Sequence, residues 1–176
     1  MRKSLLLLIN FIFICGEVYA QPLTVSCTEK EKKNLGEKDP IIVNTCLIRN
    51  FKFVDLSYPD YAGRYFYSEQ EVYVLTGKKY IKTVNSHFFN EHQDELLSFI
   101  NTKIQADFKR ASTDSVSRDC FTGLDSIPKY EVNDFRITFH KDEIWFEIDW
   151  GLPAACRFTD GTIVSFKLAQ IRKYVK

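Results

Sequence analysis

The sequence lacks the motifs that mark most catalytic and cofactor-binding proteins. It has three histidines, one methionine and seven scattered glycines, and it contains no Cys-x-x-Cys pair. It also contains no Gly-x-Ser-x-Gly motif and no glycine-rich phosphate loop. No cysteine has a histidine at the spacing of a zinc site. We therefore expect no cofactor and no metal, and nothing indicates serine-hydrolase or dithiol redox chemistry.

An excess of charge of one sign is also missing. Of the 24 basic and 23 acidic residues, Arg2, Lys3 and Glu17 lie in the first twenty positions, so 22 of each sign remain after them. Proteins that bind nucleic acid neutralise phosphates with a basic surface. The balance excludes nucleic acid as an expected partner, and it offers no polybasic patch for a membrane surface.

Long apolar runs are absent after the N-terminus. The run Leu5–Cys15 is interrupted by Asn10, and it is shorter than the about 18 apolar residues that a membrane-spanning helix needs. It follows Arg2 and Lys3, which is the order of an export signal. The pattern favours a signal peptide over a permanent anchor.

The end of this segment resembles a cleavage site. Val18-Tyr19-Ala20 has the small-x-small form, so we predict a signal peptide over 1–20 and a mature chain that begins at Gln21. Lipid attachment at Cys15 is the alternative, although Ile14 stands where such signals place a small residue. The mature protein is expected to be periplasmic or secreted, with no transmembrane segment after cleavage.

Four cysteines remain in the mature chain, and they suit an oxidising compartment. They are Cys27, Cys46, Cys120 and Cys156. Four cysteines allow three pairings. Because they divide into an N-terminal and a C-terminal pair, we predict the disulfides Cys27–Cys46 and Cys120–Cys156.

The first half of the mature chain has a strand-like pattern. Short apolar or alternating segments predict strands over 23–28, 41–48, 51–56, 64–67, 72–75 and 80–84. The charged segment 29–40 is expected to be a loop, and Ser68-Glu69-Gln70-Glu71 the turn of a hairpin. The high aromatic content, 15%, is typical of a β-rich core or of an aromatic binding surface.

The second half contains one helical segment and a further hairpin. Apolar residues at three-to-four spacing predict an amphipathic helix over 90–110, followed by a loop over 111–118. Two alternating runs, 135–139 and 144–150, flank the charged turn 141–143. A strand over 162–166 and a short helix over 168–175 complete the pattern. We predict one α+β domain over 21–176, in which an antiparallel sheet packs on the long helix and two disulfides staple the chain.

The C-terminal half resembles a known extracytoplasmic domain family. The residues that carry the resemblance are Phe135-Arg136-Ile137-Thr138-Phe139, Ile144-Trp145-Phe146, Leu152-Pro153-Ala154-Ala155, Gly161 and Phe166-Lys167-Leu168. The family is a domain of unknown function found in lysozyme-sensing anti-sigma factors and near cell-wall polysaccharide deacetylases. The resemblance implies an α+β fold outside the membrane and, by analogy, binding to a protein or a cell-wall ligand.

Tyrosines crowd the segment that precedes the helix. Candidate binding residues are Tyr58, Tyr61, Arg64, Tyr65 and Tyr67, with Tyr73 nearby and Trp145 as a more distant addition. Tyrosine and arginine are enriched at binding hot spots. Cross-strand packing of the same rings is the alternative interpretation.

Two further clusters carry potential chemistry. Glu147 and Asp149 share one strand face with Trp145, as a glycosidase carboxylate pair could, or they form the solvated face of a hairpin. His87, Glu91, His92 and Glu95 gather where the helix is expected to start, but their order is not His-Glu-x-x-His.

The sequence therefore favours an exported, non-enzymatic binding protein of the bacterial envelope or secreted space. An inhibitor or immunity protein that holds an extracytoplasmic protein or glycan is one form of it. The alternative is a cell-wall or glycan hydrolase that uses Glu147 and Asp149.

Overall fold

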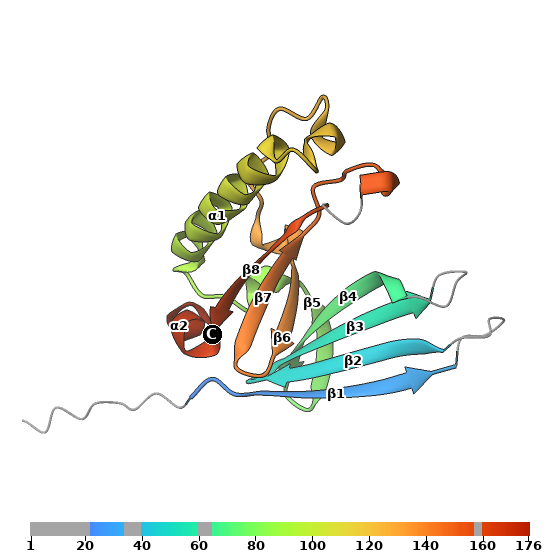
Figure 1. Ribbon diagram of the computed structural model, residues 1–176. Helices are drawn as coiled ribbons and strands as arrows, with labels where there is room; N and C mark the ends of the chain where they lie inside the picture. Colours follow the sequence, from blue (N-terminus) through green and yellow to red (C-terminus); the bar gives the residue numbers. More distant parts are fainter. Residues whose placement is uncertain (1–21, 34–39, 60–64, 157–159) are drawn as a thin grey trace, which may run out of the picture.

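The computed structural model describes residues 22–33, 40–59, 65–156 and 160–176 (Figure 1). The predicted signal peptide and Cys15 lie outside the described residues, as do Tyr61 and Arg64. Within the described ranges, no helix has the length and apolar character needed to cross a membrane.

Five strands form one antiparallel meander in which each strand pairs with the next along the chain. They are β1 (Val25–Lys32), β2 (Ile41–Ile48), β3 (Phe51–Pro59), β4 (Tyr65–Thr76) and β5 (Lys79–Thr83). One face of this five-stranded sheet carries buried residues such as Ile48, Phe53 and Val72. Period-two alternation explains this face, because successive side chains of a strand point to opposite sides.

Two sequence predictions for these strands were wrong. The segment Ser68–Glu71 is no turn, because β4 runs through it as one strand. β1 extends to Lys32, into a segment predicted as a loop. Both segments consist of polar residues with a weak preference for strands. Pairing with the neighbouring strand nevertheless holds them in the sheet.

A second, three-stranded antiparallel sheet follows. It contains β6 (Arg136–His140), β7 (Glu143–Ile148) and β8 (Thr162–Lys167) in that order. The predicted C-terminal hairpin is confirmed, although its turn is tighter than expected: His140 pairs with Glu143, and Lys141 takes a φ of 56°. The aromatic ring of Phe139 in this sheet lies 5.0 Å from that of Phe53 in the other sheet, so the two sheets share one core.

The helical segments pack around the smaller sheet. They are α1 (Gln93–Thr113), α2 (Leu168–Ile171) and the 3-10 turns η1 (Asn85–His87), η2 (Arg118–Phe121), η3 (Val132–Asp134), η4 (Ala154–Cys156) and η5 (Arg172–Tyr174). The buried stripe of α1 includes Leu96, Ile100 and Ile104, as the helical spacing predicted. α1 contacts β8, and Figure 1 shows it beside the three-stranded sheet. The expected sheet-on-helix packing is therefore present, but the larger sheet is not the one that the helix covers.

Both predicted disulfides are present. Cys27 and Cys46 are direct partners across β1 and β2. Cys120 in η2 is bonded to Cys156 in η4, which ties the end of α1 to the segment after β7. Two disulfides are compatible with an extracytoplasmic location.

Candidate functional site

The backbone brings part of the predicted tyrosine cluster together at one end of β3 and β4. Tyr58 is paired with Tyr67, and Pro59 with Tyr65, with a register shift between Tyr58 and Pro59. Residues opposite each other on neighbouring strands share a face of the sheet. Tyr58 and Tyr67 therefore occupy adjacent positions on the same face.

Trp145 does not belong to this cluster. It lies on β7 in the three-stranded sheet, where its indole Nε1 donates to Glu143 at 2.9 Å. Its ring stacks on His140 with centroids 3.9 Å apart. The structure thus engages Trp145 within its own hairpin, apart from the tyrosines of the five-stranded sheet.

The tyrosines are part of a larger surface, which we call the outer face. It includes alternate residues on the side of the five-stranded sheet that faces away from the core: Val43, Thr45, Leu47, Lys52, Val54, Leu56, Tyr58, Glu69, Glu71, Tyr73, Leu75, Tyr80 and Lys82. Leu47 is 41% exposed and Tyr80 is 39% exposed. Leu47, Lys52 and Tyr80 were not among the predicted binding residues, although the period-two pattern of β2 and β3 places the first two on this face.

A cation and two rings organise one end of the outer face. The ammonium of Lys52 lies 4.1 Å from the ring centroid of Tyr73 and 4.8 Å from that of Tyr80. Such cation–π contacts attract the ammonium to the faces of both rings and so help to hold the rings in place.

Hydrogen bonds fix the neighbouring carboxylate. The Tyr73 hydroxyl donates to Glu71 at 2.6 Å, and Lys82 donates to the same carboxylate at 2.7 Å. These bonds lower the pKa of Glu71, and the bond to Glu71 raises the pKa of Tyr73. The outer face therefore presents ordered apolar and aromatic groups beside fixed charges.

None of the helices in the described ranges covers the outer face. In Figure 1 the three-stranded sheet and α1 lie on one side of the molecule, and the far ends of β1 to β4 project away from them. Apolar surface of this kind on a sheet is typical of an interaction site.

The carboxylates predicted as a hydrolase pair are arranged differently. Glu147 has both oxygens engaged, one by Arg136 at 2.9 Å and one by the Thr138 hydroxyl at 2.6 Å. Asp149 lies beyond the end of β7 and is exposed. Although the residue is exposed, desolvation of its carboxylate by neighbouring groups, with repulsion from Asp160 and Glu147, raises the pKa of Asp149. Glu147 acts here as an anchor for Arg136.

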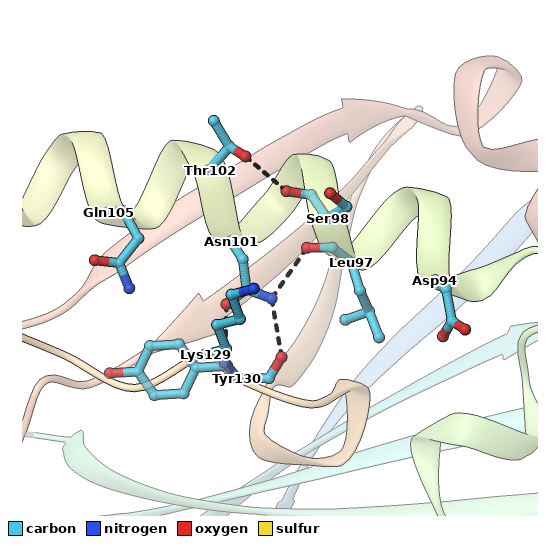
Figure 2. Close-up of a pocket in the computed structure, with 8 residues that line it drawn as sticks. All are labelled: Asp94, Leu97, Ser98, Asn101, Thr102, Gln105, Lys129 and Tyr130. Carbon is cyan, nitrogen blue, oxygen red and sulfur yellow. Dashed lines mark hydrogen bonds between the residues drawn. The ribbon is translucent and has the colours of Figure 1, made fainter.

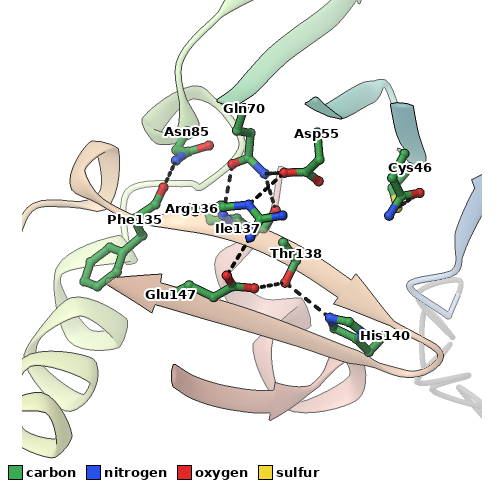
Figure 3. Close-up of polar contacts among 11 residues, drawn as sticks. Cys46, Asp55, Gln70, Asn85, Phe135, Arg136, Ile137, Thr138, His140 and Glu147 are labelled. Carbon is green, nitrogen blue, oxygen red and sulfur yellow. Dashed lines mark hydrogen bonds and ion pairs between the residues drawn. The ribbon is translucent and has the colours of Figure 1, made fainter. Parts of the chain in front are cut away.

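Arg136 joins the two sheets through a buried carboxylate (Figure 3). Its Nε donates to Asp55 of β3 at 3.0 Å, while its Nη1 holds Glu147 of β7. Asp55 is only 4% exposed, and burial raises its pKa despite the opposing effect of Arg136. The network links β3, β6 and β7, and its charged groups bond to one another.

The histidine and glutamate cluster is not on one helix. His87 ends η1, where its Nδ1 contacts the Thr83 hydroxyl, and α1 begins only at Gln93. In the part of the chain that the structure describes, no three His, Cys, Asp or Glu side chains converge as a metal site.

A shallow groove runs between α1 and the segment around Tyr130 (Figure 2). Its volume is about 490 Å³, and Leu97 and Tyr130 form its apolar part. The Asn101 amide donates to the carbonyls of Leu97 and Tyr130 and accepts from the Tyr130 N–H. Gln105 donates to two further carbonyls of the same segment. These polar groups hold the segment on the helix, so they are not available to a ligand.

Comparison of the chain with protein-family models, with curated proteins and with solved structures found no match. The outer face is therefore the candidate functional site on its geometry alone. Its accessible rings and apolar side chains suit binding. The other polar clusters described above are engaged in holding the fold together.

Proposed function

We propose that this chain is an exported, non-enzymatic binding protein that holds a protein partner on the outer face of its five-stranded sheet. The observation that carries the proposal is the exposure of Leu47 and Tyr80, with the half-buried Tyr73 beside them, on a sheet face that no described helix covers. An inhibitor or immunity protein in the bacterial envelope or secreted space acts in this way.

Physical arguments favour a protein partner for this face. Tyrosine rings bury a large area while losing few rotamers, and they are enriched at binding hot spots. The Lys52 and Glu71 charges lie beside the rings, where they can select a partner by complementary charge. The two disulfides supply rigidity in an oxidising compartment, which lowers the entropy cost of binding.

Site-specific photo-crosslinking tests the proposal. A photoreactive phenylalanine analogue is placed at Leu47 in the chain exported by its own cells. The same analogue at Val116, which is 88% exposed in the loop after α1, is the matched control. We expect a discrete protein adduct from position 47 that Tyr80→Ala weakens, and no such adduct from position 116.

Two outcomes contradict the proposal. Identical adducts from both positions indicate non-specific contact. Retention of the chain on isolated cell-wall glycan, with no protein adduct at position 47, indicates a glycan ligand in place of a protein.

A further inference from the structure

β5 covers only part of β4. It pairs with Val72–Thr76, whereas β4 begins at Tyr65. Among the described residues, no strand pairs with the Tyr65–Glu71 part of β4 on the β5 side. On this side, the Tyr65–Glu71 part of β4 therefore forms an open edge that begins where β5 ends.

The main chain of Gln70 points to this open side. The Leu75 N–H donates at 2.7 Å to the carbonyl of Asn50, its direct opposite in the β3–β4 register. Hydrogen-bonded and non-hydrogen-bonded pairs alternate along an antiparallel ladder. Asp55 and Gln70 therefore form a non-hydrogen-bonded pair. The main-chain N–H and C=O of Gln70 face away from β3, toward the side of β4 that β5 no longer covers.

Asn85 supplies an unpaired acceptor at the same place. The chain leaves β5 at Thr83 and turns inward, so that Asn85 is only 6% exposed. Its Nδ2 donates to Phe135 O at 2.7 Å and to Val132 O at 3.4 Å. Its Oδ1 is buried and has no partner among the described residues. In Figure 3 this oxygen points away from Phe135, toward the side where Gln70 lies.

Gln70 and Asn85 line one cavity of about 390 Å³, together with Glu71, Val84, Asn133 and Arg136. A buried acceptor without a partner is unfavourable, so an occupant that brings a hydrogen-bond donor to Asn85 Oδ1 is favoured. An extended polypeptide brings donors and acceptors at the spacing of a strand, which matches the open edge.

We propose that an extended segment of a partner protein adds to the open edge of β4 at this cavity. Its main chain pairs with the N–H and C=O of Gln70. Once the Asn85 side chain turns to expose its shielded Oδ1, one of the segment's N–H or hydroxyl groups donates to that oxygen. This strand-addition site borders the outer face at Glu71 and Lys82 but uses the main-chain edge of β4. It therefore goes beyond the proposed function and can fail independently of it.

The other edge of the five-stranded sheet, β1, is less suited to strand addition than the open edge of β4. β1 carries Glu29, Lys30, Glu31 and Lys32 in succession, and charges of this kind protect edge strands from pairing. On β4 the charge nearest the cavity, Glu71, is already paired with Lys82. The inward residue beside it is the uncharged Gln70.

Peptide selection with amide exchange tests the inference. The probe is a display library of random dodecapeptides, selected on the exported, oxidised chain. We expect selected peptides to slow amide exchange of Gln70 about tenfold or more and to shift the side-chain NMR signals of Asn85. Methylation of alternate main-chain nitrogens of the peptide should abolish both effects, because it removes main-chain N–H donors and leaves the peptide's side chains unchanged.

Matched variants locate the site. Val84→Arg, at an exposed residue that lines the cavity, should weaken peptide binding about tenfold or more. Val116→Arg, at an exposed valine elsewhere, should not. Failure to select any peptide overturns the inference, as does selection of peptides that bind equally well after methylation. Peptides that are sensitive to Tyr80→Ala but not to Val84→Arg also overturn it, and they assign the binding to the outer face instead.

Discussion

The side chain of Gln70 in β4 pairs with the main chain of Ile137 in β6 as a neighbouring strand would. Its Nε2 donates to Ile137 O at 2.7 Å, and its Oε1 accepts from the Ile137 N–H at 2.9 Å. The same Nε2 donates to Asp55 at 3.0 Å. β6 is an edge strand of the smaller sheet. One amide therefore closes the edge of one sheet and joins it to the other.

Replacement of Gln70 should destabilise the fold strongly. Gln70→Leu leaves the N–H and C=O of Ile137 without partners at a buried position, which should lower the free energy of unfolding by about 2–4 kcal/mol. Gln105→Leu is the matched control, because the Gln105 amide donates only to carbonyls on a more exposed segment. Urea unfolding checks both variants, and equal losses would show that the Gln70 link has no special weight.

Arg136 compensates the buried charge of Asp55. Arg136→Met removes one partner of a buried pair and should lower the free energy of unfolding by about 3–5 kcal/mol at neutral pH. Adding Asp55→Asn to Arg136→Met should recover part of this loss, because the uncompensated charge is then gone. A double-mutant cycle measured by urea unfolding tests the coupling, and additive effects of the two substitutions would contradict it.

The raised pKa of Asp55 predicts a direction for the pH dependence of stability. Burial raises this pKa above its ordinary value of 3.8, so the folded state holds the proton more tightly than the unfolded state does. The contribution of Asp55 to stability is then greatest below pH 3.8, and it falls as the pH rises through the folded pKa. We expect the stability difference between wild type and Asp55→Asn to shrink as the pH rises in this window. A difference that grows with pH would contradict the raised pKa.

The two disulfides should contribute similar stability. They span 19 and 36 residues, for which loop entropy estimates about 3 and about 4 kcal/mol. Replacement of both cysteines of one pair by alanine should lower the free energy of unfolding by about these amounts, slightly more for Cys120–Cys156. Denaturant unfolding of the two double variants provides the comparison. A loss near zero for Cys27–Cys46 would indicate that β1–β2 pairing persists in the unfolded chain and already restricts it.

Gly161 should tolerate no side chain. Its φ is +93°, and a methyl group there would overlap the carbonyl oxygen of Ile148. Gly77 is the matched control, since its φ is +63° but nothing lies within 4 Å of the added carbon. Gly77→Ala should cost about 1–2 kcal/mol from the left-handed backbone alone, and Gly161→Ala clearly more. Thermal unfolding distinguishes the two, and equal shifts in Tm would show that the backbone can move away from the clash.

The local pattern was sufficient for most of the regular elements. The stripe of Leu96, Ile100 and Ile104 has the helical period, and the alternation around Phe139 and Phe146 has the strand period. The prediction failed at Ser68–Glu71, because a run of polar residues is typical of a turn but here lies within β4. The partner that makes Gln70 suitable for a strand interior, Ile137, lies 67 residues away, and no local pattern contains that information.

The candidate site was predictable only in part. The tyrosines at positions 58 and 67 were singled out, and the β3–β4 register makes them neighbours. Trp145 was grouped with them, but it belongs to the other sheet. The carboxylate of Glu147 gave no local sign that Arg136 and Thr138 would occupy both of its oxygens.

The sequence by itself determined the period of each element and the division of its cysteines into two pairs, because both depend on residues close together in the chain. Only the tertiary structure decided that the strands divide into two sheets, that α1 covers the smaller one, and that the outer face of the larger one stays uncovered. It also decided that β5 ends before β4 does, which leaves Gln70 and Asn85 facing one cavity. The physical reason is that these features depend on hydrogen bonds and packing between residues far apart in sequence.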